Sequence, residues 1–166
     1  PRMTDPGGLW MLRLLTRGNT GFLFEDSMLY ALVNIRLFEA TLRHGLAPES
    51  AGSIAAWAIL LCTAMNDPVS AAQFVRVSIQ HAEASGDPEQ RCLCYMTQGG
   101  IIGHWRNPLA ESRPWIEKAI QASMECGLVE YTGYCHSHLC FRSGRNLRIG
   151  NPFYCLVRSV AYEDDT

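Results

Sequence analysis

Two cysteines and two histidines fall within six positions of the segment GYCHSHLC, residues 133–140. Thiolate and imidazole groups bind zinc and also act as nucleophile and base, so Cys135, His136, His138 and Cys140 are candidates for a metal-dependent or thiol enzyme. On a helix, His136 and Cys140 share one face as an i,i+4 pair, while Cys135 and His138 share another as an i,i+3 pair. We therefore do not expect the four side chains to surround one ion.

A closed zinc site would need two further ligands from elsewhere in the chain. The remaining candidates show neither C-x-x-C nor H-E-x-x-H spacing: Cys92, Cys94, His104 and Cys126. Cys92 and Cys94 would point about 200° apart on a helix. A nucleophilic pair of Cys94 and His104 is conceivable, but seven cysteines and five histidines always allow some such pairing. The sequence thus predicts no metal site, no cofactor and no catalytic residue.

Other chemical motifs are missing from the sequence. It contains no G-x-x-x-x-G-K-[ST] phosphate loop, and the glycines of QGGIIGHW, residues 98–105, follow no predicted strand and open no predicted helix. That segment instead favours a surface for close helix packing. Four acidic residues fit a solvated helix face better than a catalytic carboxylate pair: Glu111, Glu117, Glu125 and Glu130. We expect a chain that is not itself an enzyme.

The elements that would position these residues are helices. Asp or Asn precedes Pro at five places, and this pair is typical of a helix start because the side chain caps free N–H groups while Pro suits the first turn. Three of the starts, at Asp67, Asp87 and Asn107, are evenly spaced. Their spacing of about 20 residues fits one helix plus a short connection. No segment shows the alternation typical of a strand.

Helix ends repeat as well. Gly45, Gly86 and Gly127 are equally spaced along the chain, and each follows an amphipathic stretch. In this register apolar residues coincide in two sets: Phe38, Ile79 and Ile120, which we expect to be buried, and Val33, Phe74 and Trp115. The pattern predicts an all-α, tetratricopeptide-like array of antiparallel helical hairpins, an α-solenoid with a period of about 41 residues.

The expected domain organisation is one helical-repeat domain at 1–143 and a divergent tail or partial helix at 144–166. Pro114 is expected inside the sixth helix, where it would remove a backbone hydrogen bond and bend the axis. No internal linker indicates a second domain. Helices are predicted near 6–17, 26–44, 48–65, 68–85, 88–104, 108–126 and 129–143, with a further one at 152–162.

Composition narrows the function classes. The chain has 166 residues, 48% of them hydrophobic and 18% charged, as in a globular domain with a real core. A net charge of −2 with dispersed cations argues against nucleic acid and against a polybasic membrane patch. The longest apolar run, at 54–65, is too short for a bilayer, and no secretory signal is recognisable, so we expect a cytoplasmic protein. Because the sequence starts at Pro1 without an initiator Met, we expect it to be part of a longer protein.

Several segments together resemble the helical region of very large bacterial and fungal signalling proteins. These segments are MTDPGGLWMLRLL, GLAPESAGSIAAWAILL and HWRNPLAESRPWIEKAIQASMECGLVEYTGYC, and the resemblance covers about residues 1–143. In that family a serine/threonine kinase-like domain precedes a predicted ATPase of the STAND/AAA type, the tetratricopeptide-like region, and GAF and histidine-kinase domains. The tail GRNLRIGNPFYCLVRSVAYEDDT departs from the family pattern.

The resemblance implies a regulatory and interaction module between catalytic domains, with none of the family's catalytic residues inside the chain. Its partners would be the neighbouring ATPase, GAF and kinase domains or a protein or peptide partner. One alternative is the small metal-dependent or thiol enzyme centred on Cys135, His136, His138 and Cys140. Another is the ligand-sensing repeat region of an ATPase-type transcriptional regulator.

Overall fold

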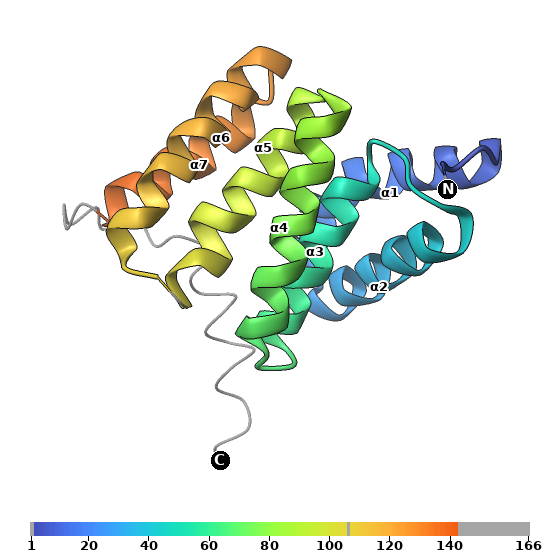
Figure 1. Cartoon of the computed structure of the whole chain (residues 1–166), viewed down its shortest axis with the longest axis horizontal. Helices are drawn as coiled ribbons and strands as arrows, with labels where there is room; N and C mark the ends of the chain where they lie inside the picture. The colour runs from blue at the N-terminus through green and yellow to red at the C-terminus, as the bar shows by residue number, and fades with distance from the viewer. Residues whose placement is uncertain (1, 106, 143–166) are drawn as a thin grey trace.

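The computed structural model describes residues 2–105 and 107–142, and in that part the chain is all-helical (Figure 1). The predicted helix at 152–162 and the tail at 144–166 lie outside the described residues. Seven α-helices occur in the described part: α1 (Pro6–Glu25), α2 (Ser27–His44), α3 (Ser50–Thr63), α4 (Pro68–Ser85), α5 (Pro88–Met96), α6 (Arg113–Cys126) and α7 (Val129–Arg142). Three short non-α turns connect α5 to α6: the π-helical η1 (Thr97–Ile102) and the 3-10 helices η2 (Gly103–Trp105) and η3 (Leu109–Ser112).

Consecutive helices pack against one another along the whole array. Contacts join α1 to α2, α2 to α3, and so on to α6 and α7. Figure 1 shows α3 and α4 in the middle, with α1 and α2 on one side and α6 and α7 on the other. Ten of the fourteen residues of α3 are buried, so α3 is a central packing element. The all-α prediction is confirmed for the described residues.

The predicted Asp-Pro helix starts are confirmed by their hydrogen bonds. Asp5 Oδ2 accepts from the backbone N–H of Gly8 at 2.7 Å, and Asp67 Oδ1 accepts from that of Ser70 at 2.9 Å. The side chain of Asp87 caps α5 in the same way. Each carboxylate satisfies an amide that has no partner inside the first helical turn.

The third predicted start in the evenly spaced series is different. Asn107 and Pro108 precede the 3-10 helix η3, and α6 begins only at Arg113. Pro114 therefore lies in the first turn of α6, where the backbone N–H that proline lacks has no helical partner to lose. The predicted bend inside the sixth helix is wrong for this reason.

Two predicted helix lengths are also corrected. The first helix was expected to end at residue 17, but α1 continues through Gly18 and Gly21 to Glu25. Phe22, in the added part of the helix, packs against the buried clusters that contain Leu37 of α2 and Leu60 of α3, and this packing outweighs the weak helix preference of glycine. The fifth helix was expected to run to 104, but α5 ends at Met96 and continues as η1 and η2.

The three spaced glycines all terminate helices with positive φ angles. Gly45, Gly86 and Gly127 follow α2, α4 and α6 with φ values of 97°, 71° and 73°. Gly86 and Gly127 are left-handed, whereas Gly45 has ψ of −175° and leads into an extended segment. The glycines therefore share a role at helix ends, although the chain leaves the first one in a different direction.

The expected burial of the coinciding apolar positions is correct only in part. Ile79 is buried, but Phe38 and Ile120 are half-buried. The ring of Phe38 on α2 stacks on Trp57 of α3 with centroids 4.9 Å apart, and it meets Phe74 of α4 edge-on. Equal sequence spacing did not produce equal burial, because the neighbours that cover each position differ.

The largest buried cluster joins α3, α4, α5, α6 and α7, and it contains Ile79, Cys94, Tyr95, Ile116 and Cys135. A second cluster lies among α3, α4 and η1, and a third holds α1 to α2. Two of the clusters thus support the segment between α5 and α6, because η1 contributes to the second and α6 to the first. None of the helices in residues 2–105 and 107–142 is both long and apolar enough to cross a membrane.

Candidate interaction groove

The cysteine–histidine segment lies on α7, and its four side chains face different surroundings. Cys135 is completely buried in the main cluster. His138 is also buried, and its Nε2 lies 3.1 Å from where a Cβ of Gly100 would be. His136 is exposed, with its Nδ1 2.8 Å from the carbonyl oxygen of Thr132. The fourth residue, Cys140, is half-buried.

These four residues therefore do not converge on one point. The metal or thiol enzyme alternative requires such convergence, and the observed packing does not supply it. Among the residues that the structure describes, no three His, Cys, Asp or Glu side chains are grouped to hold a metal ion. The split between helix faces follows from the spacing within the segment, as the sequence predicted.

The buried thiols are poor nucleophiles. Burial raises the pKa of Cys94 and of Cys135 from 9.0 to about 12, and it raises the pKa of Cys92 further, with neighbouring thiols adding to the shift. Burial also raises the pKa of Cys126. The thiolate is the reactive form, so a raised pKa leaves these groups protonated and unreactive near neutral pH. His104, considered as a base for Cys94, is exposed beside Trp105 while Cys94 lies in the core.

The glycines of QGGIIGHW allow the close helix packing that the sequence predicted. A Cβ on Gly99 would lie 2.8 Å from Cγ1 and 3.0 Å from the backbone nitrogen of Ile116. A Cβ on Gly100 would meet the ring of His138 at 3.1 Å. The π-helical turn η1 is thus held directly against α6 and α7. Such turns are frequent at functional sites.

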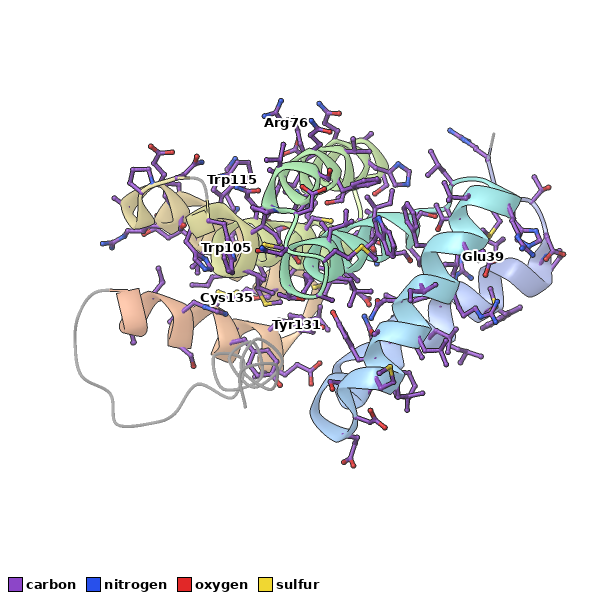
Figure 2. The ribbon with its side chains drawn as sticks, turned by 90° about the horizontal axis from the view of Figure 1, so that it is seen from below. Glu39, Arg76, Trp105, Trp115, Tyr131 and Cys135 are labelled. Atoms are coloured by element: carbon purple, nitrogen blue, oxygen red, sulfur yellow. The ribbon has the colours of Figure 1, made fainter. Side chains whose placement is uncertain are left out.

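The outer side of the same turn borders a groove of about 430 Å³. Its first wall is a row on α4 with a spacing of four residues, formed by Ala72, Arg76 and Gln80. Its floor contains buried residues, among them Ile79 and Ile102. The facing residues come from three further elements: Gln98 and Gly103 of η1 and η2, Asn107 of the connection, and Trp115 of α6. Figure 2 shows Arg76 and Trp115 on neighbouring elements, away from Glu39 on α2.

Arg76 differs from most of the described arginines in having no acidic partner. It is exposed and forms no ion pair with any carboxylate in the described part of the chain. No Asp or Glu of that part lines the groove. Six other arginine side chains are ion-paired: Arg13, Arg17, Arg36, Arg43, Arg91 and Arg113. The groove therefore carries an uncompensated positive charge.

The amides that line the groove are equally unused. Within residues 2–105 and 107–142, the side chains of Gln80, Gln98 and Asn107 form no hydrogen bond to protein. Each amide offers both donors and an acceptor. At the α6 end, Lys118 Nζ lies 4.7 Å over the ring of Trp115, which adds a second cation beside the groove. The combination provides polar groups without internal partners above an apolar floor.

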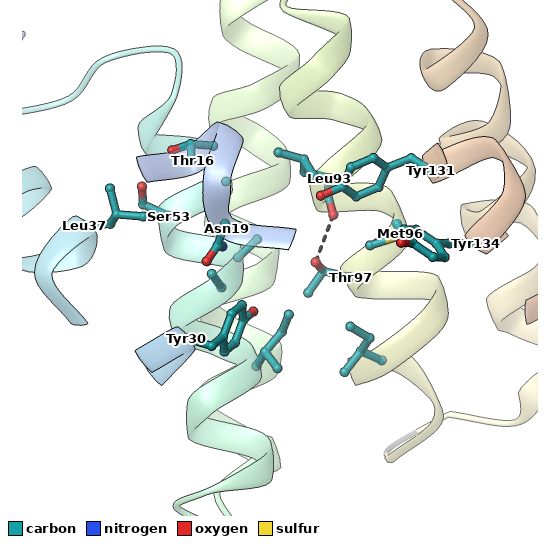
Figure 3. Close-up of a pocket in the computed structure, with 15 residues that line it drawn as sticks. Thr16, Asn19, Tyr30, Leu37, Ser53, Leu93, Met96, Thr97, Tyr131 and Tyr134 are labelled. Atoms are coloured by element: carbon teal, nitrogen blue, oxygen red, sulfur yellow. Dashed lines mark hydrogen bonds between the residues drawn. The ribbon is translucent and has the colours of Figure 1, made fainter. Parts of the chain in front are cut away.

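Two other hollows are less suited to binding. A cavity of about 50 Å³ lies between α1, α2, α3, α5 and α7, with Tyr30, Thr97, Tyr131 and Tyr134 around it (Figure 3). Thr97 Oγ1 donates to the carbonyl oxygen of Leu93 at 2.9 Å. This volume is large enough for water molecules but is far below the roughly 300–1,000 Å³ typical of sites for organic ligands.

The other hollow is a cleft of about 410 Å³ where α1 faces the starts of α3 and α5. Its two arginines are already paired: Arg13 Nε lies 2.6 Å from Glu49 Oε1, and Arg17 lies 3.3 Å from Glu89, while the third carboxylate, Asp87, caps α5. The cleft thus resembles a helix junction whose two arginines are both occupied. An incoming ligand would have to break these pairs.

Sequence reasoning missed Arg76, Gln80 and Asn107 as groove residues. A signal for Arg76 exists in the sequence, because no Asp or Glu lies three or four positions from it, whereas Arg36 has Glu39 and Arg113 has Glu117. Such an arginine on a helix has no local partner. The groove itself had no sequence signal, because its two walls come from segments that are far apart in the chain.

Comparison with known proteins adds no relative. No protein-family model matches the chain, and no curated protein and no solved structure matches it. The function is therefore inferred from the residues and their geometry.

Proposed function

We propose that this chain is a non-catalytic regulatory and interaction module of a multidomain signal-transduction protein of the ATPase and kinase type. The observation that carries the proposal is the groove between α4, η1 and α6, where Arg76 and three side-chain amides line an apolar floor without internal partners in the described part of the chain. Unpaired polar groups in a concave surface favour recognition of another molecule. The resemblance of residues 1–143 to the helical region of such signalling proteins supports the same role.

We further propose that the helices form a tetratricopeptide-like repeat with a period of about 41 residues. The spacing of Gly45, Gly86 and Gly127 supports this proposal, since each ends a helix with positive φ. In such an array each hairpin packs on its neighbours, and a groove formed by successive units faces a partner. The cytoplasm is the compartment that this role requires.

A partner bound in the groove would act through helix packing. Gln98 and Trp115 line the groove, while Gly99 and Gly100, next to Gln98, contact α6 and α7. A segment bound in the groove would therefore contact η1, the turn that packs against α6 and α7. A ligand shifts such packing only by the difference in its affinity for the two arrangements. Neighbouring ATPase, GAF or kinase domains are the proposed recipients of the signal.

The test uses the full-length parent protein with residues 1–143 deleted. Signal-dependent output should be lost, while the separate kinase and ATPase activities continue to turn over, because the deleted segment supplies no catalytic group. As a finer variant, Arg76→Gln combined with Gln98→Ala leaves the helices in place and should reduce the signal response. A parent that keeps its normal signal-dependent output after the deletion would contradict the proposal.

The ligand-sensing region of an ATPase-type transcriptional regulator is a second candidate function. The observation that favours it is the groove volume of about 430 Å³, which falls in the usual range for small-molecule sites. A DNA-binding domain encoded in the same reading frame would support this candidate. Kinase domains on both sides of the chain would support the first one.

A further inference from the structure

We propose that the groove between α4, η1 and α6 binds a short extended peptide segment that carries an acidic side chain. This inference rests on the proposed interaction function and names the chemistry of the partner. It depends on three features of the groove: its length, its unpaired amides and its uncompensated cation.

The length of the groove fits a few extended residues. The wall from Ala72 to Gln80 spans two helical repeats of four residues, which is roughly 12 Å at about 1.5 Å per residue. An extended peptide advances about 3.3 Å per residue, so this wall matches about four residues. Alternate side chains of such a peptide point in opposite directions. Those pointing inward would meet the apolar floor at Ile79 and Ile102.

The amides fit a peptide backbone better than a free anion. Gln80 stands on the α4 wall, whereas Gln98 and Asn107 come from the facing side, and all three lack intrachain side-chain hydrogen bonds in the described residues. A backbone presents N–H donors and C=O acceptors in alternation, and each side-chain amide can serve both. A simple anion uses donors only. The mixed donors and acceptors on both walls therefore favour a peptide.

The charge of the groove selects the side chain of the peptide. Arg76 is exposed with no carboxylate partner among the described residues, and Lys118 lies over the ring of Trp115 at the other end. Guanidinium binds carboxylate through paired, charge-assisted hydrogen bonds. A carboxylate in the bound segment would complete the one pairing that Arg76 lacks. A lysine at the same position would be repelled.

The experiment uses the full chain and three pools of fluorescein-labelled hexapeptides with amidated C-termini. The central residue is fixed as Glu, Gln or Lys, and the flanking positions vary among Ala, Val, Leu and Ser. Fluorescence anisotropy measures the affinity of each pool. We expect the glutamate pool to bind at least tenfold more tightly than the other two, because only its carboxylate pairs with Arg76.

Two variants with the same loss of charge separate the groove from general electrostatics. Arg76→Gln should remove the preference for the glutamate pool, whereas Arg36→Gln should keep it, because Arg36 lies on α2 and is paired with Glu39 outside the groove. Gln98→Ala should weaken all three pools by a similar factor, since it removes a backbone contact. Circular dichroism confirms that each variant is folded.

Four results would overturn the inference. They are equal binding of the three pools, a glutamate preference that survives Arg76→Gln, complete displacement of the glutamate pool by 10 mM sodium acetate, and a dimer in sedimentation that Arg76→Gln dissociates. Displacement by acetate would indicate a site for small carboxylates, and the dimer would indicate that the groove binds a second copy of the chain. In each case the deletion test in the parent protein still decides the proposed function separately.

Discussion

The groove beside η1 and the cleft beside α1 are of similar size, about 430 and 410 Å³, but their arginines differ in pairing. In the cleft, Arg13 and Arg17 are paired with Glu49 and Glu89. In the groove, Arg76 has no such partner in the described part of the chain, and no carboxylate of that part lines it. Volume alone therefore does not distinguish a binding surface from a helix junction.

The difference lies in the cations, because an arginine without a carboxylate partner can pair with an incoming molecule whereas a paired one cannot do so without breaking its ion pair. The ion pairs of the cleft join Arg13 and Arg17 on α1 to Glu49 and Glu89 at the starts of α3 and α5, so these charges interact within the chain. The groove instead has a packed base formed by Ile79, Gly99 and Ile116, which belong to α4, η1 and α6, the elements that carry its polar walls. Stability should thus depend on the base of the groove, and binding on its walls. Five measurements test this division.

The largest effect is expected at the floor of the groove. Ile79 is buried and belongs to the main core cluster, so Ile79→Ala should lower the free energy of unfolding by about 2–5 kcal/mol, as loss of a large core side chain does. Val77, on the same helix, is half-exposed, and Val77→Ala should change it by no more than about 0.5 kcal/mol. Urea denaturation followed by circular dichroism measures both. Equal effects would mean that the groove has no packed floor.

The next effect concerns the close approach of η1 and α6. Gly99→Ala places a methyl group 2.8 Å from Ile116 Cγ1, and the resulting overpacking should destabilise the protein by about 1–3 kcal/mol. Gly133→Ala is the matched control, because the added methyl group on α7 would lie more than 4 Å from every described atom outside the adjacent residues and the backbone of its own helix. The control should gain up to about 1 kcal/mol from helix preference. Melting temperatures that fall for Gly99→Ala and rise for Gly133→Ala would confirm the tight packing.

Alkaline pH should weaken the main core cluster, in which Cys135 is buried with Ile79 and Ile116. Folding raises the pKa of Cys135 from 9.0 to about 12, so the folded state holds its proton more tightly than the unfolded state. This stabilisation is complete below pH 9 and is lost as pH rises toward 12. At pH 10 the loss is about 1.4 kcal/mol for one thiol, from one pKa unit of difference in proton binding.

The measurement for this prediction is urea denaturation at pH 8 and pH 10. Cys135→Ala removes the thiol and should show a smaller decrease between the two values than the original chain. Cys94, in the same cluster and with a pKa of about 12, should contribute in the same direction. A stability that does not change between pH 8 and pH 10 would contradict the assigned burial of these thiols.

The paired cleft should give a small effect that depends on salt. Arg13 is half-exposed while Glu49 is largely covered, so Arg13→Gln should cost about 0.2–1 kcal/mol, the range for ion pairs near the surface. The difference should shrink in 0.5 M sodium chloride because mobile ions screen exposed charges. Denaturation at low and high salt measures it. A cost that is independent of salt would point to packing of the arginine stem instead.

The smallest effect on stability is expected at Arg76. It is exposed and has no ion pair among the described residues, so Arg76→Gln should change the free energy of unfolding by less than about 0.5 kcal/mol. The same substitution should remove the preference for acidic peptides. A loss of stability greater than about 1 kcal/mol would show that Arg76 has a structural role, and the contrast with the cleft would fail.

Local sequence chemistry predicted much of the helical framework. Asp5, Asp67 and Asp87 cap helices as expected, because capping involves only a side chain and the next two or three backbone amides. Gly45, Gly86 and Gly127 end helices for a similarly local reason, the freedom of glycine to adopt positive φ. The division of Cys135, His136 and His138 between helix faces also follows from spacing alone.

Features that depend on distant residues were not predictable in the same way. The extension of α1 beyond Gly18 accompanies the packing of Phe22 against other helices, and the turn η1 lies in close contact with Ile116 and His138, so tertiary packing outweighs weak local preferences. The full burial expected for Phe38 and Ile120 failed because a register does not specify which neighbours cover a side chain.

The sequence by itself determined that this protein is a chain of capped helices without a recognisable catalytic or phosphate-binding motif, since those properties depend on residues close together in the chain. Only the tertiary structure decided which polar groups remain unpaired. Gln80, Gln98, Asn107 and Trp115 line one groove because η1 packs against both α4 and α6. The pairing state of Arg76 likewise depends on which acidic residues the fold brings near it, and that is a property of the assembled helices.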